Sequence, residues 1–307
     1  MPPAPVLAVV GPTAAGKSDL AVDLAIALGG EVVNGDSMQI YRGMDIGTAK
    51  LTPEEQRGVP HHLLDRLDVT EPATVAEFQG WARDAIDDCR ARGVVPVLAG
   101  GSALYLRAVL DDFEFPGTDA GVRARLEAEL TEHGPGALHE RLARADPAAA
   151  QVILPSNGRR IVRALEVVEI TGRPYRANLP EHDYAYDDVV QVGLDVPREV
   201  LDERIRLRVD RMWAAKLVDE VRRLESLGLR DGRTASRALG YAQVLRHLAG
   251  ECTEDEARED TVRGTRKFAR RQDTWFKRDP RIGWLPYDAP DLLDRALAGC
   301  APLTLEG

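Results

Sequence analysis

The chain is poor in cysteine, has no excess of positive charge and contains no long apolar run. Its three cysteines are odd in number and lack metal-ligand spacing, which excludes a disulfide framework or a zinc knuckle and favours a reducing compartment. Lys and Arg total 40 against 50 Asp and Glu, and the net charge of −10 excludes a uniformly basic nucleic-acid coat protein. The apolar run at 6–10 is too short for a secretory signal, and no later run is long enough for a membrane span. We therefore expect a cytoplasmic globular protein whose 307 residues form one large domain or two smaller ones.

Strand-like and helix-like segments alternate over residues 6–110. Short apolar runs predict strands at 6–10, 31–33 and 94–99, and apolar residues at helical spacing predict helices at 19–28, 74–92 and 104–110. Alternation of this kind predicts parallel strands joined by right-handed crossovers. The predicted fold class is therefore α/β, with a doubly wound parallel sheet.

The pattern changes after residue 111. Residues 120–171 have helical spacing, residues 189–196 are strand-like again, and helices dominate from residue 198 onward. We therefore predict that residues 1–111 and 188–307 form the α/β core, with a helical C-terminal part. Residues 112–187 are predicted to form an inserted, mainly helical domain.

A candidate phosphate-binding loop follows the first predicted strand. The pattern G-x-x-x-x-G-K-[ST] is matched by Gly11, Pro12, Thr13, Ala14, Ala15, Gly16, Lys17 and Ser18. Backbone N–H groups of such a loop and the N-terminus of the following helix surround a phosphate. Lys17 adds a positive charge, and the Ser18 hydroxyl can hold Mg²⁺. The loop predicts a bound di- or triphosphate; a glycine-rich turn without a ligand is the alternative.

Asp36 comes at the carboxyl end of the second predicted strand, beside the loop that follows the first. Open α/β sheets bind ligands at this edge, and P-loop small-molecule kinases place a carboxylate there. A general base is therefore one interpretation of Asp36, and a helix-capping or turn aspartate is the other. The third strand ends in Gly100 and Gly101 with no aspartate, which argues against a standard nucleotide hydrolase or switch.

Two basic segments contrast with the acidic composition. Arg159, Arg160 and Arg163 cluster within one and a half helical turns, and seven basic residues lie between 263 and 278. One interpretation is a solvated helix face with Trp275 in the core. The other is a surface for a phosphodiester backbone.

The adjacent histidines His61 and His62 are the other candidate metal ligands in the sequence. They lack a third ligand at useful spacing. We therefore expect a role in a loop or in packing rather than in metal binding.

A set of ordered motifs lies within a stretch that extends from residue 6 to about residue 284. They are GPTAAGKS at 11–18, DSMQIY at 36–41, MDIGTAK at 44–50, HHLLD at 61–65, GGSALYL at 100–106, RRIVRALEV at 159–167, LGY at 239–241 and RRQDTWF at 270–276. Together they resemble the tRNA dimethylallyltransferase (tRNA isopentenyltransferase) family of the bacterial type. The first motif is common among P-loop proteins, but the ordered set is highly specific.

The resemblance implies a prenyl transfer that needs Mg²⁺. The phosphate loop would hold the pyrophosphate of dimethylallyl diphosphate, and the acceptor would be N6 of the adenosine 3′-adjacent to the anticodon of tRNA. Asp36 would be the general base, while Thr13 and Arg208 would stabilise the leaving pyrophosphate. We expect a monomer that binds the anticodon stem-loop.

The resemblance also assigns a set of tRNA-contacting residues, which lie in four segments and at two single positions. They are Asp36, Ser37, Met38, Gln39, Ser102, Arg123, Arg159, Arg160, Ile161, Val162, Arg163, Arg237, Ala238, Leu239, Gly240, Tyr241, Ala242, Arg270, Arg271, Gln272, Asp273, Thr274, Trp275, Phe276 and Lys277. The basic residues among them would grip the phosphate backbone.

Three alternatives remain at the level of sequence. A P-loop small-molecule kinase would use the loop for ATP, but it leaves the two basic segments without a role. An adenylate isopentenyltransferase would use the same site on a free nucleotide, and the insertion at 112–187 argues for a larger acceptor. A non-catalytic RNA-binding protein would leave Asp36 idle beside the loop.

Overall fold

The computed structural model describes residues 3–112, 115–175 and 183–304. The chain divides into two compact units, one formed by Met1–Asp112 with Tyr184–Gly307 and the other by Phe113–Asp183. The predicted insertion at 112–187 encloses the second unit. No helix in the described residues combines the length and apolar character that a bilayer-spanning helix needs.

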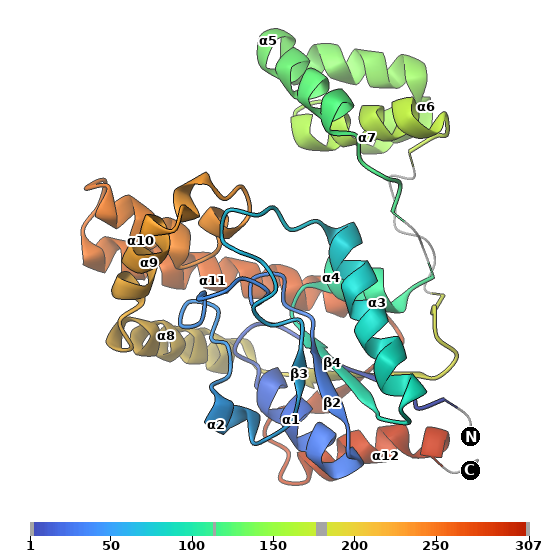
Figure 1. The fold of residues 1–307 in the computed structure, drawn as a ribbon, viewed down its shortest axis with the longest axis vertical. Helices are drawn as coiled ribbons and strands as arrows, with labels where there is room; N and C mark the ends of the chain where they lie inside the picture. The colour runs from blue at the N-terminus through green and yellow to red at the C-terminus, as the bar shows by residue number, and fades with distance from the viewer. Residues whose placement is uncertain (1–2, 113–114, 176–182, 305–307) are drawn as a thin grey trace. The chain divides into compact units, whose positions relative to one another are not determined.

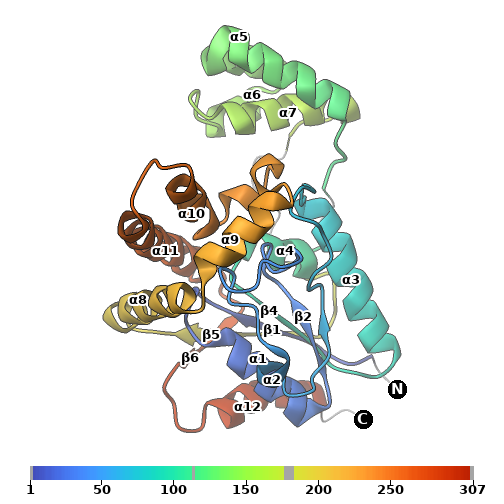
Figure 2. The same ribbon diagram turned by 60° about the vertical axis from the view of Figure 1, so that its left-hand side comes forward.

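The first unit is built on a parallel sheet of six described strands in the order β3-β2-β4-β1-β5-β6 (Figures 1 and 2). The strands are β1 Val6–Val10, β2 Glu31–Asn34, β3 His61–His62, β4 Pro96–Gly100, β5 Val189–Asp195 and β6 Ile282–Pro286. The predicted α/β class with a doubly wound parallel sheet is confirmed. Two strands lie in segments for which the sequence predicted none, namely β3 and β6.

Helices connect the strands and cover the sheet. The helices of this unit are α1 Lys17–Leu28, α2 Pro53–Gln56, α3 Val75–Ala91, α4 Ala103–Leu110, α8 Arg198–Ala214, α9 Leu217–Ser226, α10 Tyr241–Leu248, α11 Glu254–Phe276 and α12 Leu292–Thr304. Capping boxes mark where three of them begin: Thr52 with Glu55 at α2, Thr74 with Glu77 at α3, and Thr253 with Glu256 at α11.

The strand β1 is buried on both faces, as a central strand of a parallel sheet must be. Val6, Ala8 and Val10 pack with apolar residues of α3 and α4 in one core cluster, which also holds Phe276 of α11. Leu7 and Val9 pack on the other face with residues of α1 and with Ala296 of α12. Helices therefore cover both faces of the sheet (Figure 2).

The second unit is helical in its described residues. Its helices are α5 Ala120–Ala145, α6 Pro147–Val152 and α7 Gly158–Thr171, and α5 is broken at Gly134, where φ is 77°. They enclose a core of their own around Leu126, Leu142 and Leu165. The helical periodicity over 120–171 thus corresponds to three helices.

Candidate active site

The phosphate loop connects β1 to α1 and contains three residues with positive φ. Gly11, Ala14 and Gly16 all have positive φ, at 138°, 65° and 106°. An alanine in this region is uncommon, because its Cβ crowds the backbone. Successive N–H groups of such a loop converge on an anion, and α1 begins directly at Lys17. The loop therefore has the shape of an anion site.

Two cations meet at this loop. Lys17 donates a hydrogen bond from Nζ to the Pro12 carbonyl oxygen (2.7 Å). Burial and the neighbouring charge of Arg208 lower the pKa of Lys17 to about 7, while Asp36 opposes the shift. Burial also lowers the pKa of Arg208, which α8 contributes, and Asp36 again opposes the shift. Two desolvated cations side by side are stabilised by an anion, so the charge pattern points to a phosphate ligand.

Asp36 takes part in the turn after β2 and still faces these cations. Its Oδ1 accepts the N–H of Met38 (2.8 Å), and its own N–H donates to Oδ1 of Asn34 (2.9 Å). Among the described residues no hydrogen bond reaches its Oδ2, and the side chain is half-buried. The turn-forming and base interpretations are therefore compatible, because each uses a different oxygen.

The sheet order changes how Asp36 reaches the phosphate loop. The strand pattern in the sequence predicts the second strand beside the loop after the first, but β4 lies between β2 and β1. The end of β4 leaves room because it is glycine: a Cβ on Gly100 would lie 2.5 Å from the carbonyl oxygen of Gly35. This close approach lets Asp36 act electrostatically on Lys17 and Arg208 across the intervening strand.

Helix α11 contacts the phosphate loop through one buried side chain. Oε1 of Gln272 accepts the N–H of Thr13 (2.9 Å), and its Nε2 donates to the carbonyl oxygen of Gly101 (2.6 Å). Gln272 is 6% exposed, whereas Trp275 on the same helix is 45% exposed. The interpretation that placed Trp275 in the core is therefore wrong.

The segment 44–50 is anchored by Glu220 of α9, a residue that no motif in the sequence singles out. The buried Glu220 carboxylate accepts N–H groups of Asp45 (3.2 Å) and Ile46 (2.8 Å) and the hydroxyl of Tyr241 (2.5 Å). Nη2 of Arg208 donates to the carbonyl oxygen of Thr48 in the same segment (3.1 Å). Glu220 therefore helps to place Arg208.

The residues that the resemblance assigns to tRNA differ in exposure. The buried residues are Ile161, Val162, Ala238, Gly240, Tyr241, Gln272 and Phe276. The exposed residues are Arg159, Arg237, Arg270, Arg271, Thr274, Trp275 and Lys277. The others are half-buried. Within the second unit, Arg123 and Arg163 both pair with the fully buried Glu166. In each unit, taken by itself, the exposed side chains are accessible to RNA.

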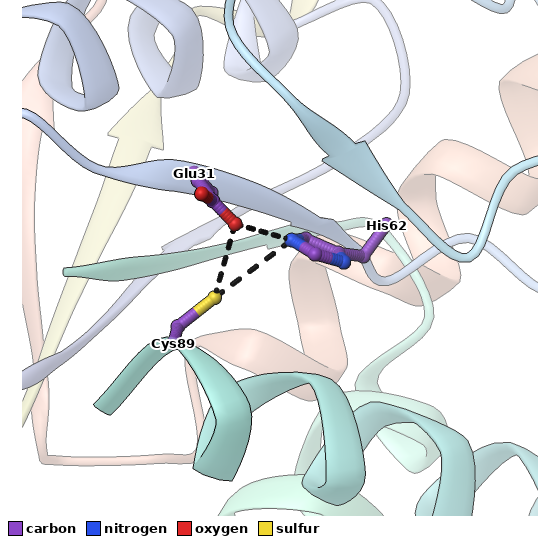
Figure 3. Close-up of side chains that lie close together, drawn as sticks. All are labelled: Glu31, His62 and Cys89. Carbon is purple, nitrogen blue, oxygen red and sulfur yellow. Dashed lines mark hydrogen bonds and ion pairs between the residues drawn. The ribbon is translucent and has the colours of Figure 1, made fainter. Parts of the chain in front are cut away.

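A second polar cluster lies where β2, β3 and the end of α3 meet, formed by Glu31, His62 and Cys89 (Figure 3). Oε2 of Glu31 lies 2.7 Å from Nε2 of His62 and accepts the Cys89 thiol at 3.5 Å. Their potential ligand atoms all lie within 4.8 Å of one another. No spacing pattern in the sequence connects His62 with Glu31 and Cys89, because these residues lie far apart in the chain.

This cluster is already neutralised by Arg92. Its guanidinium binds both carboxylate oxygens of Glu31, at 2.8 and 2.7 Å, and contributes most to lowering the pKa of Glu31 to about 2. Burial raises the pKa of the Cys89 thiol to about 11, which keeps it protonated. A cation therefore already occupies the side of Glu31 that a metal ion would use, and a structural role fits the cluster.

Comparison with known proteins agrees with this geometry. Residues 39–279 match the family described as IPP transferase. A tRNA dimethylallyltransferase from Thermobifida fusca is 70% identical over 298 residues, covering 95% of this chain and 93% of the relative. The crystal structure of a full-length tRNA isopentenylpyrophosphate transferase from Bacillus halodurans superimposes with a TM-score of 0.70 at 40% identity, covering 97% of this chain and 95% of that one.

A eukaryotic dimethylallyltransferase, whose crystallographic snapshots show it acting on tRNA, gives a TM-score of 0.82 at 26% identity. The likeness covers 96% of this chain and 77% of that one. The family match spans most of the chain, and it includes Asp45–Lys50, Arg208 and α11. The chain therefore belongs to the IPP transferase family, the family of the tRNA dimethylallyltransferases.

Proposed function

We propose that this protein transfers the dimethylallyl group of dimethylallyl diphosphate to N6 of the adenosine 3′-adjacent to the anticodon of tRNA. The observation that carries the proposal is the pair of desolvated cations, Lys17 and Arg208, at a phosphate loop that also faces Asp36. Family membership supplies the reaction class, and the site supplies residues for each step. A cytoplasmic location and a monomeric state stay predictions.

The donor is held and activated by positive charge. As the allylic C–O bond breaks, its electron pair moves onto the pyrophosphate, so charge grows on oxygens beside Lys17 and Arg208. Preorganised cations and N–H groups stabilise such charge most in a desolvated site. Thr13 lies in the loop, where its hydroxyl is proposed to donate to a leaving phosphate oxygen.

The acceptor needs a base because the lone pair of adenine N6 is delocalised into the ring. The new C–N bond forms as the N6 proton moves to a carboxylate, and Oδ2 of Asp36 is the proposed acceptor of that proton. The adenosine must leave its stack to reach this edge of the sheet, as in other enzymes that modify bases. No covalent enzyme intermediate is required.

Mg²⁺ is the proposed cofactor. The Ser18 hydroxyl at the first turn of α1 is exposed, and it offers the oxygen ligand that Mg²⁺ prefers. The remaining ligands would be water and phosphate oxygens, which is the usual pattern for this ion. Bound there, Mg²⁺ would neutralise part of the pyrophosphate charge.

The tRNA surface is proposed to comprise the exposed residues of the assigned segments. On α11 and directly after it these are Arg270, Arg271 and Lys277 with Trp275 between them, a combination suited to phosphates and a stacked base. Part of this charge is engaged within the protein, since Nζ of Lys277 lies 3.4 Å from Oδ1 of Asp273. RNA phosphates would compete for these cations.

Incubation with labelled dimethylallyl diphosphate, Mg²⁺ and unmodified tRNA tests the proposal. Nucleoside analysis should find the label on the adenosine next to the anticodon. Asp36→Asn should lower turnover by about 10²–10⁴-fold while tRNA and pyrophosphate still bind. The exposed Asp68→Asn is the matched control and should keep turnover.

The same assay separates the rival functions. Label on free AMP but not on tRNA would support an adenylate isopentenyltransferase, and phosphate transfer from ATP to a hydroxyl would support a kinase. Unchanged turnover in Asp36→Asn would remove Asp36 from the role of base. Binding of tRNA without any prenyl transfer would support the non-catalytic RNA-binding alternative.

A further inference from the structure

Gln272 lies on the buried face of α11, although the resemblance places it among residues that contact tRNA. Its side chain is 6% exposed and both ends of its amide are engaged. Oε1 accepts the N–H of Thr13 in the phosphate loop, and Nε2 donates to the carbonyl oxygen of Gly101 after β4. One side chain thus joins three segments that are far apart in the chain.

The packing around this amide is close. A Cβ on Gly101 would lie 2.4 Å from Nε2 of Gln272, so the glycine is what lets the amide reach the backbone there. The two hydrogen bonds need an acceptor at one end of the side chain and a donor at the other. Among the common side chains of this length, only the amide of glutamine supplies both.

The Thr13 N–H has consequences for the anion site. It belongs to the loop in which Ala14 holds a positive φ of 65°, a conformation that must be supported by its surroundings. Without Gln272 this half-buried N–H would lose its partner, and the loop could relax from the arrangement that surrounds a phosphate. Loss of Gln272 would therefore weaken binding of the diphosphate donor.

We propose that Gln272 is a positioning residue of the diphosphate site, which holds the phosphate loop in its anion-binding shape, and not a residue that contacts tRNA. The exposed neighbours on α11, such as Trp275 and Arg271, are the ones available to RNA. This inference rests on the proposed function, because it assumes that the loop binds the diphosphate donor.

The test compares donor affinity with tRNA affinity. Gln272→Met keeps the approximate size and removes both hydrogen bonds. Calorimetry with inorganic pyrophosphate and Mg²⁺ should show about tenfold weaker binding, and the KM for dimethylallyl diphosphate should rise by a similar factor. The Kd for tRNA without donor should stay within about twofold of the wild type.

Two matched variants on α11 complete the experiment. Arg271→Ala, on the exposed face, should show the opposite split, with weaker tRNA binding and unchanged pyrophosphate binding. Thr265→Ala removes a hydroxyl that bonds only within the helix, to the Thr261 carbonyl oxygen, and should change neither affinity. A general loss of helix stability would instead lower both affinities in all three variants, and that outcome would count against the inference.

Gln272→Asn keeps the amide but is one methylene too short to span Thr13 and Gly101. This variant replaces Gln272→Met in the test if circular dichroism shows that Gln272→Met is unfolded. Weaker tRNA binding with unchanged pyrophosphate binding in the folded variant would overturn the inference. Failure of the wild-type protein to bind pyrophosphate or to transfer the prenyl group would instead overturn the proposed function.

Discussion

Replacing Arg208 should stabilise the unliganded protein while abolishing its reaction. Arg208 is a desolvated cation beside Lys17, and burial lowers the pKa of both. A pKa lowered by burial shows that the folded protein disfavours the charged form, so an apolar residue of similar size in place of Arg208 removes a desolvation cost but also removes an attraction to Asp36. Since the desolvation of Arg208 is incomplete and Asp36 offsets part of its cost, we expect a gain of about 1–2 kcal/mol before the lost hydrogen bond is counted.

The lost hydrogen bond reduces this gain. Arg208 donates to the carbonyl oxygen of Thr48, and a hydrogen bond contributes about 1 kcal/mol. That oxygen also accepts Nε2 of Gln39 (3.2 Å), so it is not left without a partner. The expected net stabilisation of Arg208→Met is about 1 kcal/mol. Loss of the charge repulsion between Arg208 and Lys17 adds to this stabilisation.

Urea unfolding with and without pyrophosphate and Mg²⁺ measures the change in stability and the loss of pyrophosphate binding on which the reaction depends. A ligand at 100 times its Kd adds about 2.7 kcal/mol to the wild type, and Arg208→Met should gain far less. Arg211→Met, an exposed position on the same helix, should change stability by less than about 0.5 kcal/mol and keep the ligand effect. A less stable Arg208→Met, or one that pyrophosphate stabilises as much as the wild type, would refute the reasoning.

Three further predictions test other parts of the structure. Glu220→Gln should lower kcat about tenfold because Arg208 loses its support, with tRNA affinity in filter binding unchanged. Trp275→Ala should weaken tRNA binding by about 1–3 kcal/mol in the same assay while calorimetry shows unchanged pyrophosphate binding. Glu31→Gln should cost about 3 kcal/mol of unfolding free energy at neutral pH, since the pKa of Glu31 is about 2 when folded and 4.5 when unfolded. That stability is present above about pH 4.5 and lost as the pH falls toward 2, so the difference in urea midpoints between Glu31→Gln and the wild type should close over this interval.

Features encoded by neighbouring residues could be predicted from the sequence. The apolar run at 6–10 is β1, and the helix expected at 74–92 is Val75–Ala91, whose start Thr74 fixes by capping. The helical spacing at 104–110 corresponds to Ala103–Leu110. These elements follow from periodicity and capping, which are local.

Features that depend on distant residues could not be predicted. Glu220 meets Ile46 and Gln272 meets Thr13 across most of the chain, so no spacing signal connects them. Glu31 and Cys89 are also far apart in the chain, so their contact could not be predicted from spacing either. The edge strand β6 contains Gly283 and ends in Pro286, residues that are unfavourable in strands, and its pairing with β5 outweighs that local preference.

The most direct test of the proposed site is a crystal structure with pyrophosphate, Mg²⁺ and an anticodon stem-loop RNA. Pyrophosphate should lie in the loop at 11–18 within reach of Lys17 and Arg208, with adenosine N6 about 2.6–3.2 Å from a carboxylate oxygen of Asp36. Pyrophosphate bound elsewhere, or an adenosine whose N6 points away from Asp36, would contradict the assignment of the site.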